Sequence, residues 1–160
     1  MSAPTQPQRL FLDTGVIVAG CFLPWGASKA VLILATLRAN FTVVLAEAVE
    51  QELQQVVARR GASLSADGAL RVAEDVAGWL ERVRIERHPM PTPEAIRSYL
   101  PLVLPVLRHG NDLAPVITAI QAKPDWVISA NTAHWNDNLA ARTGLRIATP
   151  RAFLAQFHPA

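Results

Sequence analysis

Residues 9–18 read RLFLDTGVIV, and this stretch decides the fold class. The short, mostly apolar run Arg9–Leu12 stops at Asp13, and Gly15 follows at once, which predicts a buried strand that ends in a tight turn. The next segment, Val16–Phe22, predicts a short helix. A short apolar strand followed directly by a helix is typical of an α/β fold, in which helices cover both faces of a parallel sheet.

The same alternation continues along the chain. Further apolar strands are predicted at residues 41–45, 125–129 and 145–148, with a marginal strand at 83–85. Helices are predicted at residues 29–37 with Ser28 as N-cap, 46–60 with Gly61 as stop, 66–80 after a Ser65 cap, 95–107 after Thr92-Pro93-Glu94, 112–120 and 150–157. Apolar residues around Leu32 and Leu70 are expected in the core.

Size and composition fit one domain. A chain of 160 residues with 51% hydrophobic content can bury a proper core, so we expect a single domain over residues 1–160, with residues 1–8 disordered. The single cysteine, Cys21, excludes an intrachain disulfide and a cysteine metal cluster, and fits a reducing cytoplasm. The sequence shows neither a basic leader with an apolar run nor an apolar stretch of about 18 residues, so no membrane association is expected.

Polar side chains follow two of the predicted strands at the point where each strand ends. Asp13 and Asn131 come after apolar strands, and Asp112 opens the helix that leads into the strand before Asn131. Ligands of parallel sheets bind outside the carboxyl ends of the strands, so these side chains are expected at one rim. Each also has a purely structural alternative: an Asx turn for Asp13, an N-cap for Asp112 and a turn cap for Asn131. Their shared location favours a site.

A further acid is expected from the helix after the second strand, which offers Glu47, Glu50 and Glu52. At about 100° per residue, Glu47 points roughly 130° away from the apolar stripe, while Glu50 and Glu52 flank it at about 70° and 90°. Periodicity does not choose between the last two. Clustered carboxylates without cysteine suit Mg²⁺ or Mn²⁺, and such sites perform phosphoryl chemistry.

Other chemistries have little support. The sequence has no glycine-rich phosphate loop, no Gly-x-Ser-x-Gly elbow and no His-x-x-x-His pair, and its four histidines are scattered. The four tryptophans occur singly in apolar segments, which favours core or rim packing over a base-stacking platform. The short basic runs at residues 59–60 and 82–88 are interpreted as solvated surface.

Taken together, these segments resemble PIN-domain nucleases. The resemblance rests on residues 12–18 (LDTGVIV), Glu52-Leu53 before Val56-Val57, Asp112 with Ala119, residues 129–135 (SANTAHW) and residues 147–154 (IATPRAFL). It implies a three-layer α/β/α fold with a central parallel sheet of four to five strands. It also implies an Mg²⁺- or Mn²⁺-dependent endoribonuclease, often the toxin of a toxin–antitoxin pair, and makes Glu52 the metal-site acid in place of Glu50.

The chain departs from the family pattern at two positions. Gly15 stands where the family usually has Asn, and Asn131 stands where many members have Asp, a change that removes one negative charge. An amide oxygen can still ligate Mg²⁺, the closing pattern resembles a subgroup with Asn at this fourth position, and Asp137 is a candidate substitute. We therefore expect weaker metal binding than in a site of four carboxylates.

Three functional hypotheses follow. The first is a cytoplasmic endoribonuclease, a homodimer with an antitoxin partner, in which Asp13, Glu52 and Asp112 bind the metal and Asn131 assists. Arg59, Arg60 and Arg108 are candidates for positioning the RNA backbone, and sequence does not rank them. The second is a catalytically weakened module that binds nucleic acid or protein. The third is an Mg²⁺-dependent phosphatase, which the missing Asp-x-Asp motif disfavours.

Overall fold

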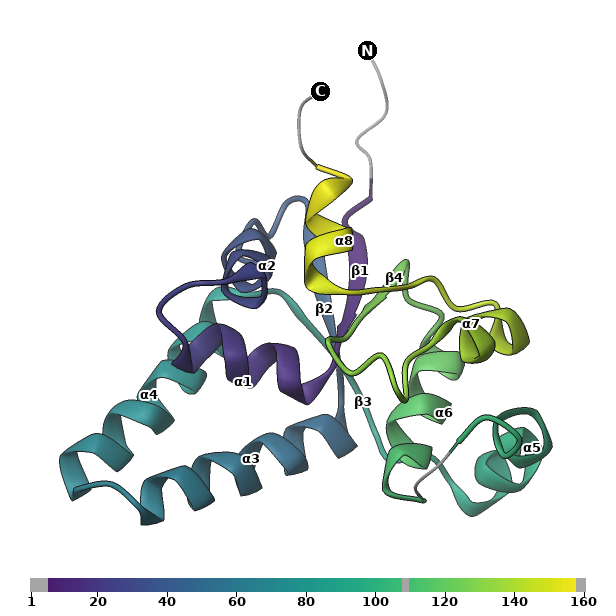
Figure 1. The fold of residues 1–160 in the computed structure, drawn as a ribbon, viewed down its shortest axis with the longest axis horizontal. Helices are drawn as coiled ribbons and strands as arrows, with labels where there is room; N and C mark the ends of the chain where they lie inside the picture. The colour runs from purple at the N-terminus through teal and green to yellow at the C-terminus, as the bar shows by residue number, and fades with distance from the viewer. Residues whose placement is uncertain (1–5, 108–109, 158–160) are drawn as a thin grey trace.

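The computed structural model describes residues 6–107 and 110–157, and Figure 1 shows their arrangement. Strands alternate with helices along most of the chain. The strands are β1 (Gln8–Leu12), β2 (Phe41–Ala46), β3 (Ile85–His88), β4 (Trp126–Ile128) and β5 (Ile147–Ala148). The α-helices are α1 (Thr14–Phe22), α2 (Ala27–Ala35), α3 (Glu47–Ala62), α4 (Ala66–Arg82), α5 (Pro93–Val103), α6 (Leu113–Ala122), α7 (Asp137–Thr143) and α8 (Pro150–Ala155).

The five strands form one parallel sheet in the order β3-β2-β1-β4-β5. Leu10 on β1 pairs with Val43 on β2 and with Trp126 on β4, so β1 is the central strand. From β1 the chain first adds strands on one side and later on the other. This reversal creates a topological switch point between the carboxyl ends of β1 and β4.

Helices cover both faces of the sheet. In Figure 1, α1 to α4 lie to one side of the strands, and α5 to α7 lie to the other. This arrangement confirms the predicted three-layer α/β/α fold with its parallel sheet of five strands. Such layers require apolar strands, and the burial follows: Leu10, Phe11 and Leu12 on β1 and Val43 to Ala46 on β2 are almost fully buried.

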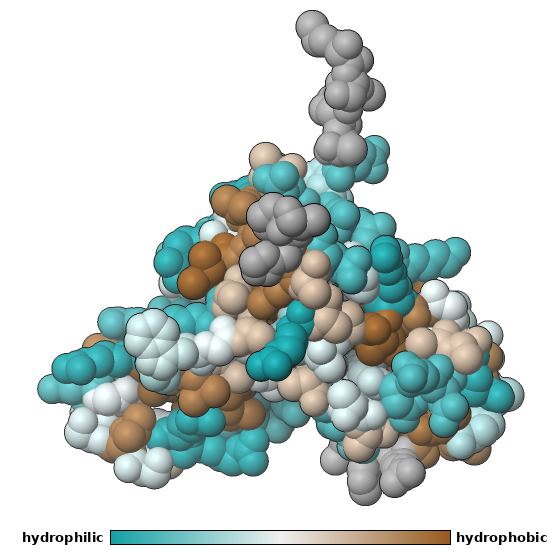
Figure 2. All heavy atoms as spheres, turned by 45° about the horizontal axis from the view of Figure 1, so that its top comes forward, coloured by the Kyte–Doolittle hydropathy of each residue, from teal (hydrophilic) through white to brown (hydrophobic). Residues whose placement is uncertain are grey.

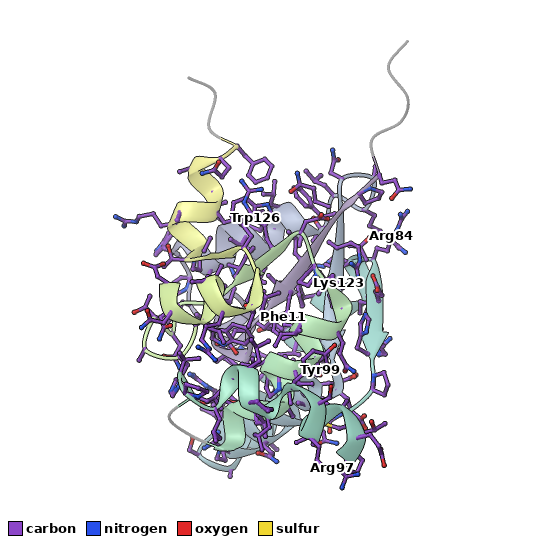
Figure 3. The ribbon with its side chains drawn as sticks, turned by 90° about the vertical axis from the view of Figure 1, so that its right-hand side faces the viewer. Phe11, Arg84, Arg97, Tyr99, Lys123 and Trp126 are labelled. Atoms are coloured by element: carbon purple, nitrogen blue, oxygen red, sulfur yellow. The ribbon has the colours of Figure 1, made fainter. Side chains whose placement is uncertain are left out.

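Aromatic side chains complete the core. Trp135 packs on Phe11 of the central strand with ring centroids 5.5 Å apart, and Trp126 packs edge-on against Phe153 of α8 at the same centroid distance. Figure 3 shows Phe11 in the interior and Arg84 and Arg97 at the periphery. The predicted core packing is therefore confirmed for Trp79, Trp126 and Trp135. Trp25, in the α1–α2 connection, is 83% exposed.

Several local predictions were wrong. Ser28 lies inside α2, whose N-cap is Gly26, and Gly61 lies inside α3, which ends at Ala62. Leu70 is 58% exposed, because α4 turns Val76 and Trp79 inward, while Leu32 is buried as expected.

Two boundaries and one helix also differ from the sequence prediction. The marginal strand predicted at 83–85 is β3 at Ile85–His88, and α7 was not predicted. The segment expected to be disordered ends earlier, since Gln8 already pairs with Phe41; residues 1–5, Arg108, His109 and His158 lie outside the described residues.

Membrane-spanning length is not reached by any single helix among residues 6–107 and 110–157. The apolar helices α1 and α2 together have the length and composition of a membrane-spanning segment, but they are bent by 97° relative to one another. Val16 and Ile17 of α1 and Val31 and Leu32 of α2 lie in the core, which accounts for the apolar character of both helices.

Close packing of α1 on α2 leads to a stability prediction. A Cβ atom added at Gly20 would lie 2.5 Å from Cγ and Cδ1 of Leu32 and 3.0 Å from the Ser28 carbonyl oxygen. We therefore expect Gly20→Ala to lower the free energy of unfolding by about 1–3 kcal/mol through overpacking, measured by urea denaturation. Gly78→Ala is the matched control, because a Cβ at Gly78 in α4 meets nothing within 4 Å, and it should be neutral or stabilising. Equal effects of the two changes would contradict the packing argument.

A polar network ties the outer strand β3 to the central strand. Arg9 on β1 donates from Nε and Nη2 to the two carboxylate oxygens of Glu86 on β3, at 2.8 and 2.6 Å, and from Nη1 to the Lys123 carbonyl at 2.9 Å. His88 Nε2 lies 2.8 Å from Glu86 Oε1. The hydrogen bonds from Arg9 in particular lower the pKa of Glu86 to about 2.

This shift predicts a pH-dependent contribution to stability. Because the pKa of Glu86 is lowered from 4.5 to about 2 in the fold, its contribution is present above pH 4.5 and is lost as the pH falls toward 2. Glu86→Gln should be less stable than the wild type at pH 7, and the difference should shrink over that window in thermal unfolding. The effect is modest because the pair is partly exposed. Glu94→Gln, in an exposed helix pair, is the control; a gap that stays constant with pH would refute the assignment.

Candidate functional site

Asp13 lies at the switch point between the carboxyl ends of β1 and β4. Its backbone N–H donates to the Ile128 carbonyl of β4 at 3.0 Å, and it is also the N-cap of α1. As the N-cap, Asp13 accepts a hydrogen bond with one carboxylate oxygen: Thr14 N donates to Asp13 Oδ1 at 2.9 Å. The second oxygen is held from across the sheet, because Ser129 Oγ donates to Asp13 Oδ2 at 2.8 Å. Asp13 is therefore more than a local turn residue.

Thr14 and Ser129 are buried hydroxyl residues that orient the acids. Thr14 Oγ1 donates to Glu52 Oε2 at 3.0 Å, linking the start of α1 to α3. Ser129 Oγ also accepts from the backbone N–H of Asn131 at 3.0 Å, so one hydroxyl positions both Asp13 and the loop after β4. Sequence reasoning gave neither residue a role. Their position directly beside a strand-end polar residue is the signal that could have found them.

The structure separates the three acids of α3. Glu52 turns toward Asp13 and Thr14, whereas Glu50 turns to Arg87 on β3, with a distance of 3.5 Å between Oε1 and Nη2. Glu47, expected to face solvent, accepts a hydrogen bond from the backbone N–H of Met90 at 2.7 Å. The geometry thus brings Glu52, the acid favoured by the resemblance, to the switch point.

Asp112 lies just before α6, but its side chain does not cap that helix. Its Oδ2 atom lies 3.0 Å from Nδ1 of His134, in the loop after β4. The contact joins two segments 22 positions apart in the sequence, and the Asp112 side chain makes no capping hydrogen bond to its own helix end. The capping alternative for Asp112 therefore fails, and His134 is a third residue near the predicted acids to which the sequence analysis gave no role.

Asn131 lies in the loop after β4. Its backbone carbonyl accepts hydrogen bonds from the N–H groups of His134 and Trp135, at 3.3 and 2.9 Å. The main chain therefore stabilises this turn, for which the Asn131 side chain was the alternative cap. Asp137, the suggested substitute ligand, lies at the start of α7 and faces a neighbouring pocket with Ser129 and Thr149. It does not join the other acids.

All four predicted residues line one pocket of about 200 Å³. Its walls also include Gly15, Pro115 and Trp135. Because Gly15 has no side chain and a Cβ there meets nothing within 4 Å, the position where the family pattern has Asn is open space. No lysine or arginine lines this pocket within the described residues.

The electrostatics of the pocket follow from this arrangement. Burial raises the pKa of Asp13 above its usual value, and the nearby carboxylates of Glu52 and Asp112 raise it further. The hydrogen bonds from Ser129 and Thr14 act in the opposite direction, since they favour the charged form. The pocket therefore gathers like charges without a basic side chain to neutralise them.

A divalent cation is the counterion that this donor set fits. All candidate ligands are carboxylate or amide oxygens, which suits a hard cation such as Mg²⁺ or Mn²⁺, and the buried Oδ2 of Asp112 accepts no well-aligned hydrogen bond from a described residue. The described side chains nevertheless include no group of three His, Cys, Asp or Glu residues close enough for a complete metal site. The oxygen atoms of the pocket are of the type that Mg²⁺ and Mn²⁺ prefer, and water molecules would have to complete the coordination shell of the ion.

A second, larger pocket of about 390 Å³ lies between α1, α2 and α4, away from the four residues. It contains Cys21, whose pKa is raised to about 11, chiefly by burial. A thiol with this pKa stays protonated at neutral pH and is a poor nucleophile. This pocket therefore offers no alternative catalytic centre based on cysteine.

Comparisons with known proteins identify the fold. No family model and no curated protein matches the sequence. Among solved structures, VapBC2 from Rickettsia felis, bound to a DNA fragment from its promoter, matches with a TM-score of 0.62 and 17% identity, covering 89% of this chain and 98% of that one.

Two further solved structures agree with this match. FitAB bound to an IR36 DNA fragment matches with a TM-score of 0.63 and 19% identity over 88% of this chain and 94% of that one. PAE2754 from Pyrobaculum aerophilum has a TM-score of 0.59 at 9% identity, over 96% and 97% of the two chains. The chain is therefore a three-layer α/β/α protein with the PIN-like fold that the sequence resemblance predicted.

The raised pKa of Asp13 leads to a stability prediction. Since the folded pKa lies above the unfolded one, the stabilising form is the protonated one, and stability is lost as the pH rises through the folded pKa. Asp13→Asn should therefore raise the Tm of the metal-free protein at pH 7 by a few degrees, with no gain at low pH.

Divalent metal should reverse this order. Millimolar Mg²⁺ or Mn²⁺ is expected to stabilise the wild type and to have less effect on Asp13→Asn, because the change removes one of the carboxylates that would hold the ion. Asp137→Asn, outside the pocket, is the control and should respond to metal as the wild type does. A metal-free Asp13→Asn protein that is less stable than the wild type at pH 7 would contradict the assignment.

Proposed function

We propose that this protein is an Mg²⁺- or Mn²⁺-dependent endoribonuclease that hydrolyses RNA phosphodiester bonds. One observation carries the proposal: Asp13, Glu52 and Asp112, from three distant parts of the chain, line a single pocket at the switch point with no basic side chain among its described lining residues. Carboxylates gathered in this way without a counterion favour a cation that takes oxygen ligands. The PIN-like fold supports the nuclease interpretation by analogy.

The residues of the chain have distinct roles in this proposal. Asp13, Glu52 and Asp112 would bind the metal, and Asn131 would assist through its amide oxygen or a bridging water. Thr14 holds the Glu52 carboxylate and, with Ser129, the Asp13 carboxylate in their orientations, which reduces the rearrangement required on binding. The His134 contact does the same for Asp112.

The chemistry of a bound divalent ion explains why the acids are needed. Such an ion neutralises a phosphodiester oxygen and lowers the pKa of a water molecule, which makes hydrolysis accessible at neutral pH. The protein supplies the geometry: the phosphate must enter a pocket of about 200 Å³ whose walls include Pro115 and Trp135. A backbone phosphate of a flexible strand meets this requirement.

A protein partner is also part of the proposal. One chain of the VapBC2 structure and one chain of the FitAB structure share this fold, and both structures contain a bound DNA fragment. By analogy, this chain would act as a toxin that an antitoxin protein covers. Ile33 in α2, Leu37 just after it, and Leu23 and Trp25 just before it are exposed. Figure 2 shows hydrophobic residues gathered on the side of the molecule where Figure 1 places α2, which offers a surface for such a partner.

A second function has specific support. Gly15 contributes no side chain to the pocket, Asn131 contributes no charge, and the described carboxylates do not form a closed metal site. A catalytically weakened module that binds nucleic acid or protein would have these properties. The two proposals differ in one observable, which is cleavage.

The cleavage test uses single-stranded RNA with Mn²⁺ or Mg²⁺. We expect cleavage by the wild type, and a loss of at least about 100-fold in Asp13→Asn and Asp112→Asn, because each change removes a charged donor needed to stabilise the transition state. Glu50→Gln is the matched control, since Glu50 pairs with Arg87 outside the pocket and should leave the rate within about threefold. RNA binding without cleavage under any divalent ion would reject the enzyme and favour the binding module.

A further inference from the structure

A groove extends from the acidic pocket along α3. It has a volume of about 390 Å³ and shares Glu52, Asp112 and Pro115 with the pocket, so the two are continuous. One wall is α3, and the other is formed by Met90 before α5 and by the first turn of α6. A ligand with one group at the carboxylates can therefore continue into this groove without leaving the protein surface.

The α3 wall is a regular stripe. Its lining residues are Ala48, Gln51, Glu52, Gln55 and Arg59, at the three- and four-residue spacings that place side chains on one helix face. A rise of about 1.5 Å per residue separates Glu52 from Arg59 by roughly 10 Å along the helix axis. The groove thus has carboxylates near one end and a guanidinium at the other, with the uncharged amide of Gln55 between them and that of Gln51 beside Glu52.

These groove side chains are available to a ligand. The side chains of Gln51, Gln55 and Arg59 are exposed and make no hydrogen bond or ion pair with any residue in the described part of the chain. Other cations nearby are engaged: Arg60, the next residue, lies over the Phe22 ring at 4.8 Å, and Arg87 pairs with Glu50. Of the two basic residues of this helix that the sequence did not rank, Arg59 is therefore the better candidate for contacting a nucleic-acid backbone.

We propose that this groove holds the single nucleic-acid strand next to the cleaved phosphate, with Arg59 on a backbone phosphate and Gln51 and Gln55 on base edges or sugar hydroxyls. The inference rests on the proposed function, which supplies the phosphate at the acidic end. A guanidinium matches a phosphate in charge and geometry, and a primary amide both donates and accepts hydrogen bonds to unpaired bases. The groove volume lies at the lower end of small-ligand pockets, about 300–1,000 Å³, which suits a single strand and not a duplex.

The charge pattern makes metal and strand binding interdependent. The carboxylates at one end repel a polyanion, so we expect RNA to bind the groove tightly only when a divalent ion neutralises that end. An acidic peptide held by Arg59 alone would show no such requirement for the carboxylates. Metal dependence of binding therefore separates a nucleic-acid strand from a protein segment as the occupant.

The test compares neighbouring residues of the same type on α3. Arg59→Gln is matched by Arg60→Gln, and Gln55→Ala is matched by Gln54→Ala, which is exposed and does not line the groove. Binding of a fluorescent single-stranded RNA of mixed sequence is measured by anisotropy, with Ca²⁺ and without divalent ions, at several salt concentrations. Thermal unfolding checks that each variant folds. All four positions lie on the outer surface of one helix, so each pair shares the same structural risk.

The expected results differ for charge and amide. Arg59→Gln should weaken RNA binding by about 3- to 10-fold and reduce the slope of log K against log salt by about 0.7, the value for one phosphate contact on a single strand. Gln55→Ala should weaken binding by a few-fold with the slope unchanged, because the amide carries no charge. Arg60→Gln and Gln54→Ala should stay within about twofold of the wild type.

Failure of the groove and failure of the enzyme are distinguishable. If the wild type cleaves RNA but Arg59→Gln retains its affinity and salt slope, the groove assignment is wrong and the nuclease stands. If the wild type never cleaves but Arg59→Gln loses affinity as expected, the groove stands and the enzyme is rejected. Equal losses in Arg59→Gln and Arg60→Gln, RNA binding that is independent of divalent ions, or no RNA binding at all would overturn the groove.

Discussion

The pairing of β1 with β4 at the switch point is the constraint on which the candidate site depends. The hydrogen bond from Asp13 N to the Ile128 carbonyl joins two strand ends more than 100 positions apart in the chain. It places Asp13 beside Ser129, whose hydroxyl then holds one carboxylate oxygen while the N-terminus of α1 holds the other. The acid therefore follows directly on a strand that is paired on both sides and buried at Leu10, Phe11 and Leu12.

The remaining acids reach the same point through packing of different layers. Glu52 comes from α3, on the side of the sheet that carries α1, and the Thr14 hydroxyl connects the two helices. Asp112 comes from the start of α6, on the other side, and His134 of the β4 loop contacts it. The cost of this convergence is visible in the raised pKa of Asp13, since burial and repulsion both disfavour its charge. The charged Asp13 carboxylate therefore lowers the stability of the fold, and a bound cation would offset this loss.

Local patterns predicted much of this arrangement, and their failures have physical causes. The apolar run before Asp13 predicted both a buried strand and its polar end, because these depend on neighbouring residues only. The choice between Glu50 and Glu52 was beyond periodicity, since both flank the apolar stripe and Arg87 of β3 attracts one of them. Leu70 was expected inside, but the face that α4 buries is set by the helices it packs on. Helix α7 has seven residues, too few for a periodic signal.

Two properties of the pocket remain in tension, the negative charge that attracts a cation and the incomplete set of ligands around it. A divalent ion whose coordination shell is completed by water molecules would satisfy both properties. An anomalous difference map from crystals of the wild-type protein soaked in Mn²⁺ tests that claim most directly. We expect a peak between the carboxylates of Asp13, Glu52 and Asp112. A map with no peak in this pocket, or with Mn²⁺ bound only elsewhere, would contradict it.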